Sequence, residues 1–501
     1  MKVRSIHLTA VFLLGLACLG PPAAAAPRNV VFILADDLGW GELGCYGQQK
    51  IRTPHIDRLA AEGTRFTRHY SGAPVCAPAR CVLLTGKHLG HAEIRGNRQA
   101  HLSFPRFKEG QHPISSATVT LAEVFRDAGF ATGAMGKWGL GPVDSTGDPN
   151  SQGFDLFFGY NCQAVAHSFY PRFLWRNDRQ VEINPHPIPG HGKQAEGEVK
   201  MEDWIGETYA SIPIREAALK FIRDNKDRRF FLYLPFTEPH VAMHPPVGSV
   251  DEYPEEWDDR PYRGQCAYLP HPRPRAGYAA MISDLDRHVG DVVNELRGTG
   301  ILDETLIIFT SDNGTTHRCR NGEEKQFGIG GVDADFFHST GGLRGFKGSV
   351  YEGGLRVPMI ARLPGTVPAG ATNDVPSYFA DWFPTLCSAF GLENTTAHDG
   401  DDLWPVIGGK ASSKPRKPMV WVYPEYGGQV AVNFGEMKVV RQRLNSRNPG
   451  PWEVYDLAKD PAETTNIADE NPEIVAKAVA VLKRETNAND LFPLTIPGVN
   501  D

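Results

Sequence analysis

The sequence lacks several features that would place it in other classes of protein. It has no CxxC pair among its eight cysteines, which argues against a zinc cage or a dithiol redox site. It has no internal repeat and no low-complexity tract, so neither a solenoid nor a disordered chain is expected. It also lacks an excess of basic residues, and its formal charge of −7 disfavours nucleic acid as a partner. With 501 residues and 41 % hydrophobic content, we expect a globular, enzyme-sized protein.

After residue 26, no apolar run is long enough to span a bilayer. Within residues 1–26, Lys2 and Arg4 form a basic start, residues 8–19 an apolar core and residues 23–26 a small-residue cleavage site. This core is shorter than the ~20 residues that span a bilayer. We therefore predict a signal peptide over 1–26, an exported protein that is periplasmic or secreted, and no transmembrane span. A membrane anchor and a lipid anchor on Cys18 are the alternatives, and Gly15 fits the lipid-anchor motif poorly.

The cysteines that remain after signal removal are odd in number. They are Cys45, Cys76, Cys81, Cys162, Cys266, Cys319 and Cys387. An odd number in an exported protein points to one thiol with a special role. Which of the others form disulfides does not follow from their spacing.

Three continuous apolar runs predict parallel strands that are buried on both faces, at residues 28–34, 230–234 and 305–309. Polar residues follow each of them: Asp36 and Asp37, then Glu238 and His240, then Asp312 and Asn313. Helical patterns alternate with these runs, which favours an α/β fold. Because ligands bind at the carboxyl ends of parallel strands, we expect these polar side chains to share one site.

The predicted domains are a catalytic domain over 27–410 and a smaller α+β subdomain over 411–501. The first should contain a large, mostly parallel central sheet flanked by helices. A short polar segment near residues 410–417 suggests the boundary. Two loop-rich segments, 183–198 and 241–274, are expected either to carry specificity or to cover surface.

The segment from Cys76 to Gly86 contains the decisive motif. It reads Cys76-Ala77-Pro78-Ala79-Arg80, followed by Leu84-Thr85-Gly86. Pro78 suits a first helical turn, so Cys76 should lie at a helix N-terminus, where an anion is favoured. The motif resembles the signature of type I, formylglycine-dependent, arylsulfatase-like sulfatases, although Ala79 stands where serine is commonest. The resemblance implies an alkaline-phosphatase-like sandwich.

The resemblance also implies the chemistry. A formylglycine-generating or anaerobic sulfatase-maturing enzyme would oxidise Cys76 to an aldehyde, whose hydrate attacks sulfur and later releases sulfate. Calcium, rather than magnesium, would be held by oxygen ligands. These ligands would be Asp36, Asp37, Asp312, Asn313 and the oxygen derived from Cys76.

Other residues match family positions that bind sulfate or move protons. The sulfate-binding cations would be Arg80, Lys137 and Lys347, and the proton donor to the leaving group would be His240, with His244 as the competitor. Gly139 departs from the family, because many members have a histidine there that contacts the aldehyde diol. We predict that His167 supplies the missing base; a loop histidine without chemistry is the alternative.

The expected substrate is a sulfated saccharide, with exo-acting cleavage of galactose or N-acetylgalactosamine sulfate favoured, and aryl sulfates should report the activity. The residues predicted to bind it are His88, His91, Arg95 and Asn97, although an ordinary capped loop explains them too. Two other functions remain open. One is a phosphodiesterase or phosphonate monoester hydrolase, and the other is an unmodified pseudoenzyme that binds sulfated glycans.

Overall fold

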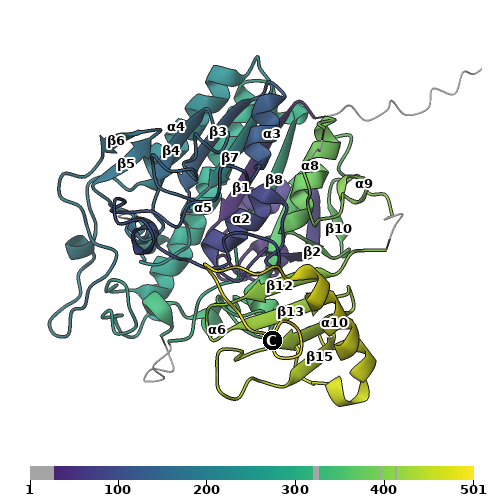
Figure 1. Cartoon of the computed structure of the whole chain (residues 1–501). Coiled ribbons are helices and arrows are strands. Elements are labelled where there is room, and N and C mark those ends of the chain that lie inside the picture. Colours follow the sequence, from purple (N-terminus) through teal and green to yellow (C-terminus); the bar gives the residue numbers. More distant parts are fainter. Residues whose placement is uncertain (1–26, 247, 320–326, 394–395, 412–414) are drawn as a thin grey trace, which may run out of the picture.

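The structure is a computed structural model that describes residues 27–246, 248–319, 327–393, 396–411 and 415–501. The predicted signal peptide at 1–26 lies outside the described residues. Figure 1 shows a large α/β unit and, in yellow-green, a smaller C-terminal unit beside it.

The large unit is built on an 11-stranded sheet with the order β10-β2-β9-β8-β1-β7-β3-β4-β5-β6, in which β11 also pairs with β2. Its centre, from β8 to β4, is parallel, whereas β9, β5 and β6 pair antiparallel with their neighbours. The strands are β1 (Asn29–Ala35), β2 (Thr64–Tyr70), β3 (Ala131–Lys137), β4 (Leu156–Tyr160), β5 (Phe173–Arg176), β6 (Arg179–Glu182), β7 (Phe230–Pro235), β8 (Thr305–Ser311), β9 (Arg356–Arg362), β10 (Ala371–Asn373) and β11 (Ser377–Tyr378).

Helices cover both faces of this sheet, because alternate side chains of each central strand point to opposite sides. In β1, Val30, Phe32 and Leu34 enter one core with α2, α3 and α8, while Val31 and Ile33 enter the other with α1, α4 and α5. The helices are α1 (Pro54–Ala61), α2 (Cys76–Thr85), α3 (Leu121–Asp127), α4 (Ser211–Asn225), α5 (Pro274–Gly298), α6 (Ala334–Phe337), α7 (Glu352–Leu355), α8 (Trp382–Phe390), α9 (Trp404–Ile407) and α10 (Pro472–Glu485). The predicted large, mostly parallel central sheet with flanking helices is confirmed.

The C-terminal unit is a four-stranded antiparallel sheet with α10 packed against it. Its strands are β12 (Met419–Tyr423), β13 (Gln429–Asn433), β14 (Met437–Arg441) and β15 (Trp452–Asp456), in that order. Trp421 on β12 donates to the carbonyl of Ser71 at 3.0 Å, and Lys438 on β14 forms buried ion pairs with Glu352 of α7 and Glu463. The small α+β unit expected from the sequence is therefore present and is joined to the large one by polar contacts.

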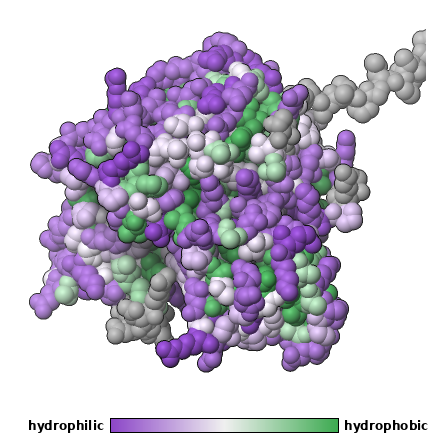
Figure 2. All heavy atoms as spheres, in the orientation of Figure 1, coloured by the Kyte–Doolittle hydropathy of each residue, from purple (hydrophilic) through white to green (hydrophobic). Residues whose placement is uncertain are grey.

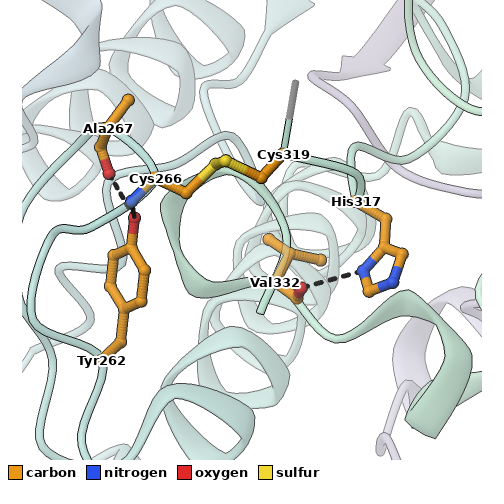
Figure 3. Close-up of a disulfide and its surroundings, with 6 residues drawn as sticks. All are labelled: Tyr262, Cys266, Ala267, His317, Cys319 and Val332. Carbon is orange, nitrogen blue, oxygen red and sulfur yellow. Dashed lines mark hydrogen bonds between the residues drawn. A yellow bond between two sulfur atoms is a disulfide. The ribbon is translucent and has the colours of Figure 1, made fainter. Parts of the chain in front are cut away.

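A disulfide between Cys266 and Cys319 joins two loops that are 53 residues apart in sequence (Figure 3). The hydroxyl of Tyr262 accepts from the Cys266 amide at 2.9 Å and donates to the Ala267 carbonyl at 2.6 Å. The described residues also include five free cysteines: Cys45, Cys76, Cys81, Cys162 and Cys387. Cys76 is thus one of the unpaired thiols.

The face shown in Figure 2 is largely hydrophilic, with hydrophobic atoms in small, separate areas. Within the described ranges, no helix has the length and apolar content needed to cross a bilayer.

Candidate active site

The strand register brings the predicted polar residues to one edge of the large sheet. Ala35 of β1 pairs with Ser311 of β8, so Asp36 and Asp312 are the next residues of two adjacent strands. The amide of Asp36 donates to the carbonyl of Glu238, which follows β7. Cys76 is the first residue of α2, and its Sγ lies 3.3 Å from Asp36 Oδ1. The sheet edge, the N-terminus of α2 and the Cys76 thiol therefore lie together, as predicted.

The acidic residues form one buried cluster. Asp37 has a left-handed backbone, with φ 65°, and its amide donates to Asp312 Oδ1 at 3.1 Å. Asn313 donates from Nδ2 to Asp37 Oδ1 at 2.7 Å. Potential metal-binding atoms of Asp36, Asp37, Cys76 and His240 lie within 4.8 Å of one another. The side chains of this group are well placed to surround a cation.

Three cations hold these carboxylates. Arg80 binds Asp312 Oδ2 through Nε at 3.1 Å and Nη2 at 2.8 Å. Lys137, the last residue of β3, lies 2.5 Å from Asp36 Oδ2, and Lys347 lies 2.7 Å from Asp37 Oδ2. The three predicted sulfate-binding cations are therefore all within the cluster.

The surroundings disfavour the ionised forms of two of the buried carboxylates, Asp37 and Asp312. Burial raises the pKa of Asp312 to about 6, with a further increase from Asp36. Burial also raises the pKa of Asp37, even though Lys347 opposes the shift. The pKa of Asp36 is instead lowered, because Lys137, His240 and Arg80 outweigh the effect of burial. A bound cation would stabilise the charged forms of Asp37 and Asp312.

The Cys76 thiol is not a thiolate. It is 2 % exposed, and burial raises its pKa far above the usual range, with a further increase from Asp36. Lys137, whose Nζ is 3.6 Å from the sulfur, acts in the opposite direction but does not outweigh these effects. At neutral pH the unmodified side chain is a protonated thiol and a weak nucleophile.

Two histidines lie together beside the cluster. His240 Nε2 is 3.6 Å from Asp37 Oδ2, and the ring of His167 stacks on His240 with centroids 5.1 Å apart and an interplanar angle of 10°. His244 packs instead against Phe169 and Tyr170. Thus the structure brings His167 next to His240, although the two are 73 positions apart.

The place left by Gly139 is filled by a glutamine. A Cβ atom on Gly139 would lie 2.2 Å from Gln163 Nε2, and φ of Gly139 is 134°. Gln163 Nε2 donates to the Trp138 carbonyl at 3.4 Å, which Arg80 Nη1 also contacts at 3.5 Å. Sequence reasoning missed Gln163, because nothing in its local pattern marks it.

The loop predicted to bind substrate divides into two parts. Asn97 Oδ1 accepts from the amide of Ala77 in α2 at 3.0 Å, so Asn97 adjoins the nucleophile helix. Arg95 donates to the carbonyls of Ala92 and Gly90.

His88 and His91 point towards the C-terminal unit. Each has its Nε2 3.7 Å from Glu485 Oε2, and His91 Nδ1 is 2.9 Å from Asp399 Oδ1. The Gly90 amide donates to His88 Nδ1 at 3.1 Å, which in neutral His88 leaves the proton on Nε2. That tautomer suits a contact with the carboxylate rather than a bound metal.

A cleft of about 810 Å³ opens beside Asp37 and Lys347, between the two units. Its other lining residues include Tyr268, His317, Arg318, Arg344, Phe346 and Tyr426. Tyr268 and His317 are each two residues from a cysteine of the disulfide in Figure 3. Tyr268 lies in the loop-rich segment 241–274, but no periodic pattern singles out the individual lining residues in the sequence.

Comparisons with known proteins agree with this geometry. A sequence model of the sulfatase family matches residues 28–392, and a model of the C-terminal region of N-sulphoglucosamine sulphohydrolase matches residues 345–489. Arylsulfatase A from Homo sapiens is 31 % identical over an alignment that covers 94 % of this chain and 90 % of the relative. N-acetylgalactosamine-6-O-sulfatase from Bacteroides thetaiotaomicron is 28 % identical, with 91 % and 92 % covered. The solved structure of Ps i-CgsB in complex with k-i-k-neocarrahexaose has a TM-score of 0.73 at 24 % identity, with 95 % and 96 % covered.

The predicted alkaline-phosphatase-like sandwich and the predicted family are thus both confirmed. The chain belongs to the type I sulfatase family, whose members hydrolyse sulfuric esters.

Proposed function

We propose that this protein hydrolyses sulfate esters of saccharides, with calcium and with a formylglycine made from Cys76. The observation that carries the proposal is the position of Cys76 at the start of α2, facing a strand edge where carboxylates and fixed cations meet. Sulfate ester hydrolysis needs the fixed cations, because positive charge must oppose the negative charge that develops on the sulfuryl oxygens. The carboxylates hold these cations in place and offer ligands to a metal ion.

The described residues fit a calcium ion. Asn313 Oδ1 is buried and has no hydrogen-bond partner among the residues with described positions, so this oxygen is available as a ligand. Asp36, Asp37 and Asp312 add carboxylate oxygens, which hard cations prefer, and magnesium is the less favoured ion. When bound, calcium would stabilise negative charge on oxygen at this edge of the sheet.

They also fit conversion of residue 76. A protonated, buried thiol cannot supply the nucleophile, whereas an aldehyde hydrate supplies hydroxyl oxygens on the same carbon. The conversion requires a formylglycine-generating or anaerobic sulfatase-maturing enzyme as a partner. It also agrees with an exported protein that carries a signal peptide over 1–26.

The chain's own side chains would bind the sulfate and move protons. Lys137 and Lys347 are held by Asp36 and Asp37, so their ammonium groups are fixed before substrate arrives. Arg80 anchors the Asp312 side of the cluster. His240 donates from Nδ1 to the Val241 carbonyl, so its Nε2 is the atom that takes up a proton and returns it to the leaving oxygen.

The cleft supports a saccharide as the leaving group. Its volume of about 810 Å³ lies within the range of sites for small organic ligands, and Tyr268, Tyr426 and Arg344 offer ring faces and donors. We favour exo-acting cleavage of a galactose or N-acetylgalactosamine sulfate, the latter being named for the Bacteroides relative. Of the loop residues predicted to bind substrate, Asn97 has the most direct contact with α2.

The test is turnover by protein produced with a maturing enzyme. We expect release of sulfate from an aryl sulfate and from a sulfated N-acetylgalactosamine, with much slower cleavage of an aryl phosphodiester and a phosphonate monoester. Cys76→Ala should abolish sulfate release, while Cys45→Ala, which removes another free thiol, should retain it. Faster cleavage of the phosphorus esters would favour the phosphodiesterase alternative. Binding of a sulfated glycan without any turnover would favour the pseudoenzyme.

A further inference from the structure

The loop-rich segment 183–198 places a third histidine beside the stacked pair. His191 Nε2 lies 3.0 Å from His167 Nδ1, and the amide of Tyr268 donates to His191 Nδ1 at 3.3 Å. The rings of His191 and Tyr268 stack with centroids 4.5 Å apart. Two hydrogen bonds therefore connect the Tyr268 amide through His191 to His167, and the His167 ring stacks on His240.

The backbone packing brings the loop to this position. A Cβ atom on Gly190 would come within 2.7 Å of the backbone carbonyl and the Cβ of His167, so only glycine allows such an approach. The amide of Gly192 donates to the carbonyl of Tyr268 at 3.3 Å. Contacts on both sides of His191 thus hold its ring between His167 and Tyr268.

These hydrogen bonds determine where the ring protons lie. Burial lowers the pKa of His191 and, together with His240 and the two lysines of the site, the pKa of His167, so both rings are neutral near pH 7. A backbone amide can only donate, hence Nδ1 of His191 is the acceptor and its Nε2 carries the proton. That proton is donated to His167 Nδ1, which leaves the proton of His167 on Nε2.

We infer that His191 fixes His167 as the Nε2–H tautomer and so makes His167 a hydrogen-bond donor to an oxygen of the sulfate ester. No acceptor for His167 Nε2 is found among the residues that the structure describes. This inference rests on the proposed function, and it changes the role expected from the sequence. A second base would need a free lone pair on the nitrogen that meets the substrate, and this tautomer has none at Nε2.

The two stacked histidines then present opposite groups. His240 donates from Nδ1 to the Val241 carbonyl and keeps a lone pair on Nε2. His167 accepts at Nδ1 and keeps a proton on Nε2. One ring can therefore take up a proton while the other donates a hydrogen bond to the charged substrate, and His191 is the positioning residue for the second.

Nitrogen-15 NMR of the histidine rings tests the tautomer directly and needs no activity. In protein labelled at histidine, the resonances lost in His167→Gln identify His167. We expect a protonated Nε2 and an unprotonated Nδ1 in the wild type. A proton on Nδ1 of His167 would overturn the inference, whether or not the protein is an active sulfatase.

Kinetics with an aryl sulfate test the consequence. His191→Ala should lower kcat/KM about ten-fold, the effect of one lost hydrogen bond to a charged transition state. His191→Gln should recover most of this loss, since its amide can donate to His167 Nδ1. His186→Ala, an exposed histidine of the same loop, should match the wild type.

Equal losses in the alanine and glutamine variants, with unchanged thermal stability, would contradict the positioning role. Absence of turnover in the wild type would instead count against the proposed function, and the NMR result would still decide the tautomer.

Discussion

Arg80 binds Asp312 through two nitrogens on a single oxygen: Nε and Nη2 lie 3.1 Å and 2.8 Å from Oδ2. Both side chains are essentially inaccessible to solvent. The guanidinium also donates from Nη1 to the carbonyl of Lys137 at the end of β3. The arginine of the Cys76 motif therefore connects α2, the acidic cluster at the strand edge and the end of β3, where Lys137 lies.

Replacing Arg80 by lysine should damage both activity and stability. A lysine keeps the charge but cannot make the two-nitrogen contact and the carbonyl contact together. We expect at least a ~100-fold loss of kcat/KM and a decrease of about 3 kcal/mol in the free energy of unfolding. Arg126→Lys, at an exposed pair with Asp127, is the control and should change neither. A folded, fully active Arg80→Lys enzyme would contradict this account of the site.

Calcium should stabilise the folded protein through Asn313. At a calcium concentration of 100 times Kd, the gain in unfolding free energy is about 2.7 kcal/mol, measurable as a rise in Tm over chelator-treated protein. Asn313→Ala removes the unpartnered oxygen and should lose most of this rise. Asn445→Ala, which loses a side-chain hydrogen bond to Pro424, should keep it. An equal rise in all three proteins would place the ion elsewhere.

Much of this site could be predicted from the sequence, because continuous apolar runs mark the central strands. The apolar runs of β1, β7 and β8 end next to Asp36, Glu238 and Asp312, and parallel pairing then forces their ends together. The residues Thr120 and Glu123 form another local pattern, a capping box, and α3 begins at Leu121 with Thr120 as its N-cap. Such patterns can be recognised in the sequence because they depend only on residues that are close together in it.

The rest depends on contacts between distant loops. His191 is 24 residues from His167 and 77 from Tyr268, and no spacing rule joins three loop residues. Gln163 is visible only once the chain folds back over Gly139. The same holds for the disulfide, whose partners are one of many possible pairs.

Stability should fall as the pH rises through the titration of Glu42. This carboxyl is buried and accepts from the Gly39 amide and the Tyr278 hydroxyl, and burial raises its pKa to about 7 from 4.5. Between these two pH values the folded protein keeps a proton that the unfolded chain has lost, so unfolding becomes easier by up to about 3 kcal/mol. Denaturant unfolding at pH 5 and pH 8 measures the change. Glu42→Gln should make the pH dependence shallower; an identical slope would show that Glu42 does not titrate there.

The buried ion pair between Lys438 of the C-terminal unit and Glu352 of the large unit should hold the two units together. Lys438 Nζ lies 2.8 Å from Glu352 and 3.0 Å from Glu463, with all three side chains inaccessible to solvent. Lys438→Met removes the cation beside Glu463 and leaves Glu352 only Arg356, 3.5 Å from its Oε2, so we expect a loss of about 3 kcal/mol in the free energy of unfolding. Lys459→Met, at an exposed pair with Asp456, should leave Tm unchanged. Equal Tm values for the two variants would mean that the buried pair does not hold the units together.

The central claim concerns one side chain, and the mass of the peptide that contains residue 76 tests it most directly. The protein should be produced with and without a maturing enzyme, digested, and assayed for aryl sulfate turnover in parallel. We predict that maturation replaces the Cys76 thiol by an aldehyde, with the corresponding loss of mass and reactivity towards hydrazide, and that kcat rises with the fraction converted. Full turnover by protein whose Cys76 remains an unmodified thiol would contradict the account.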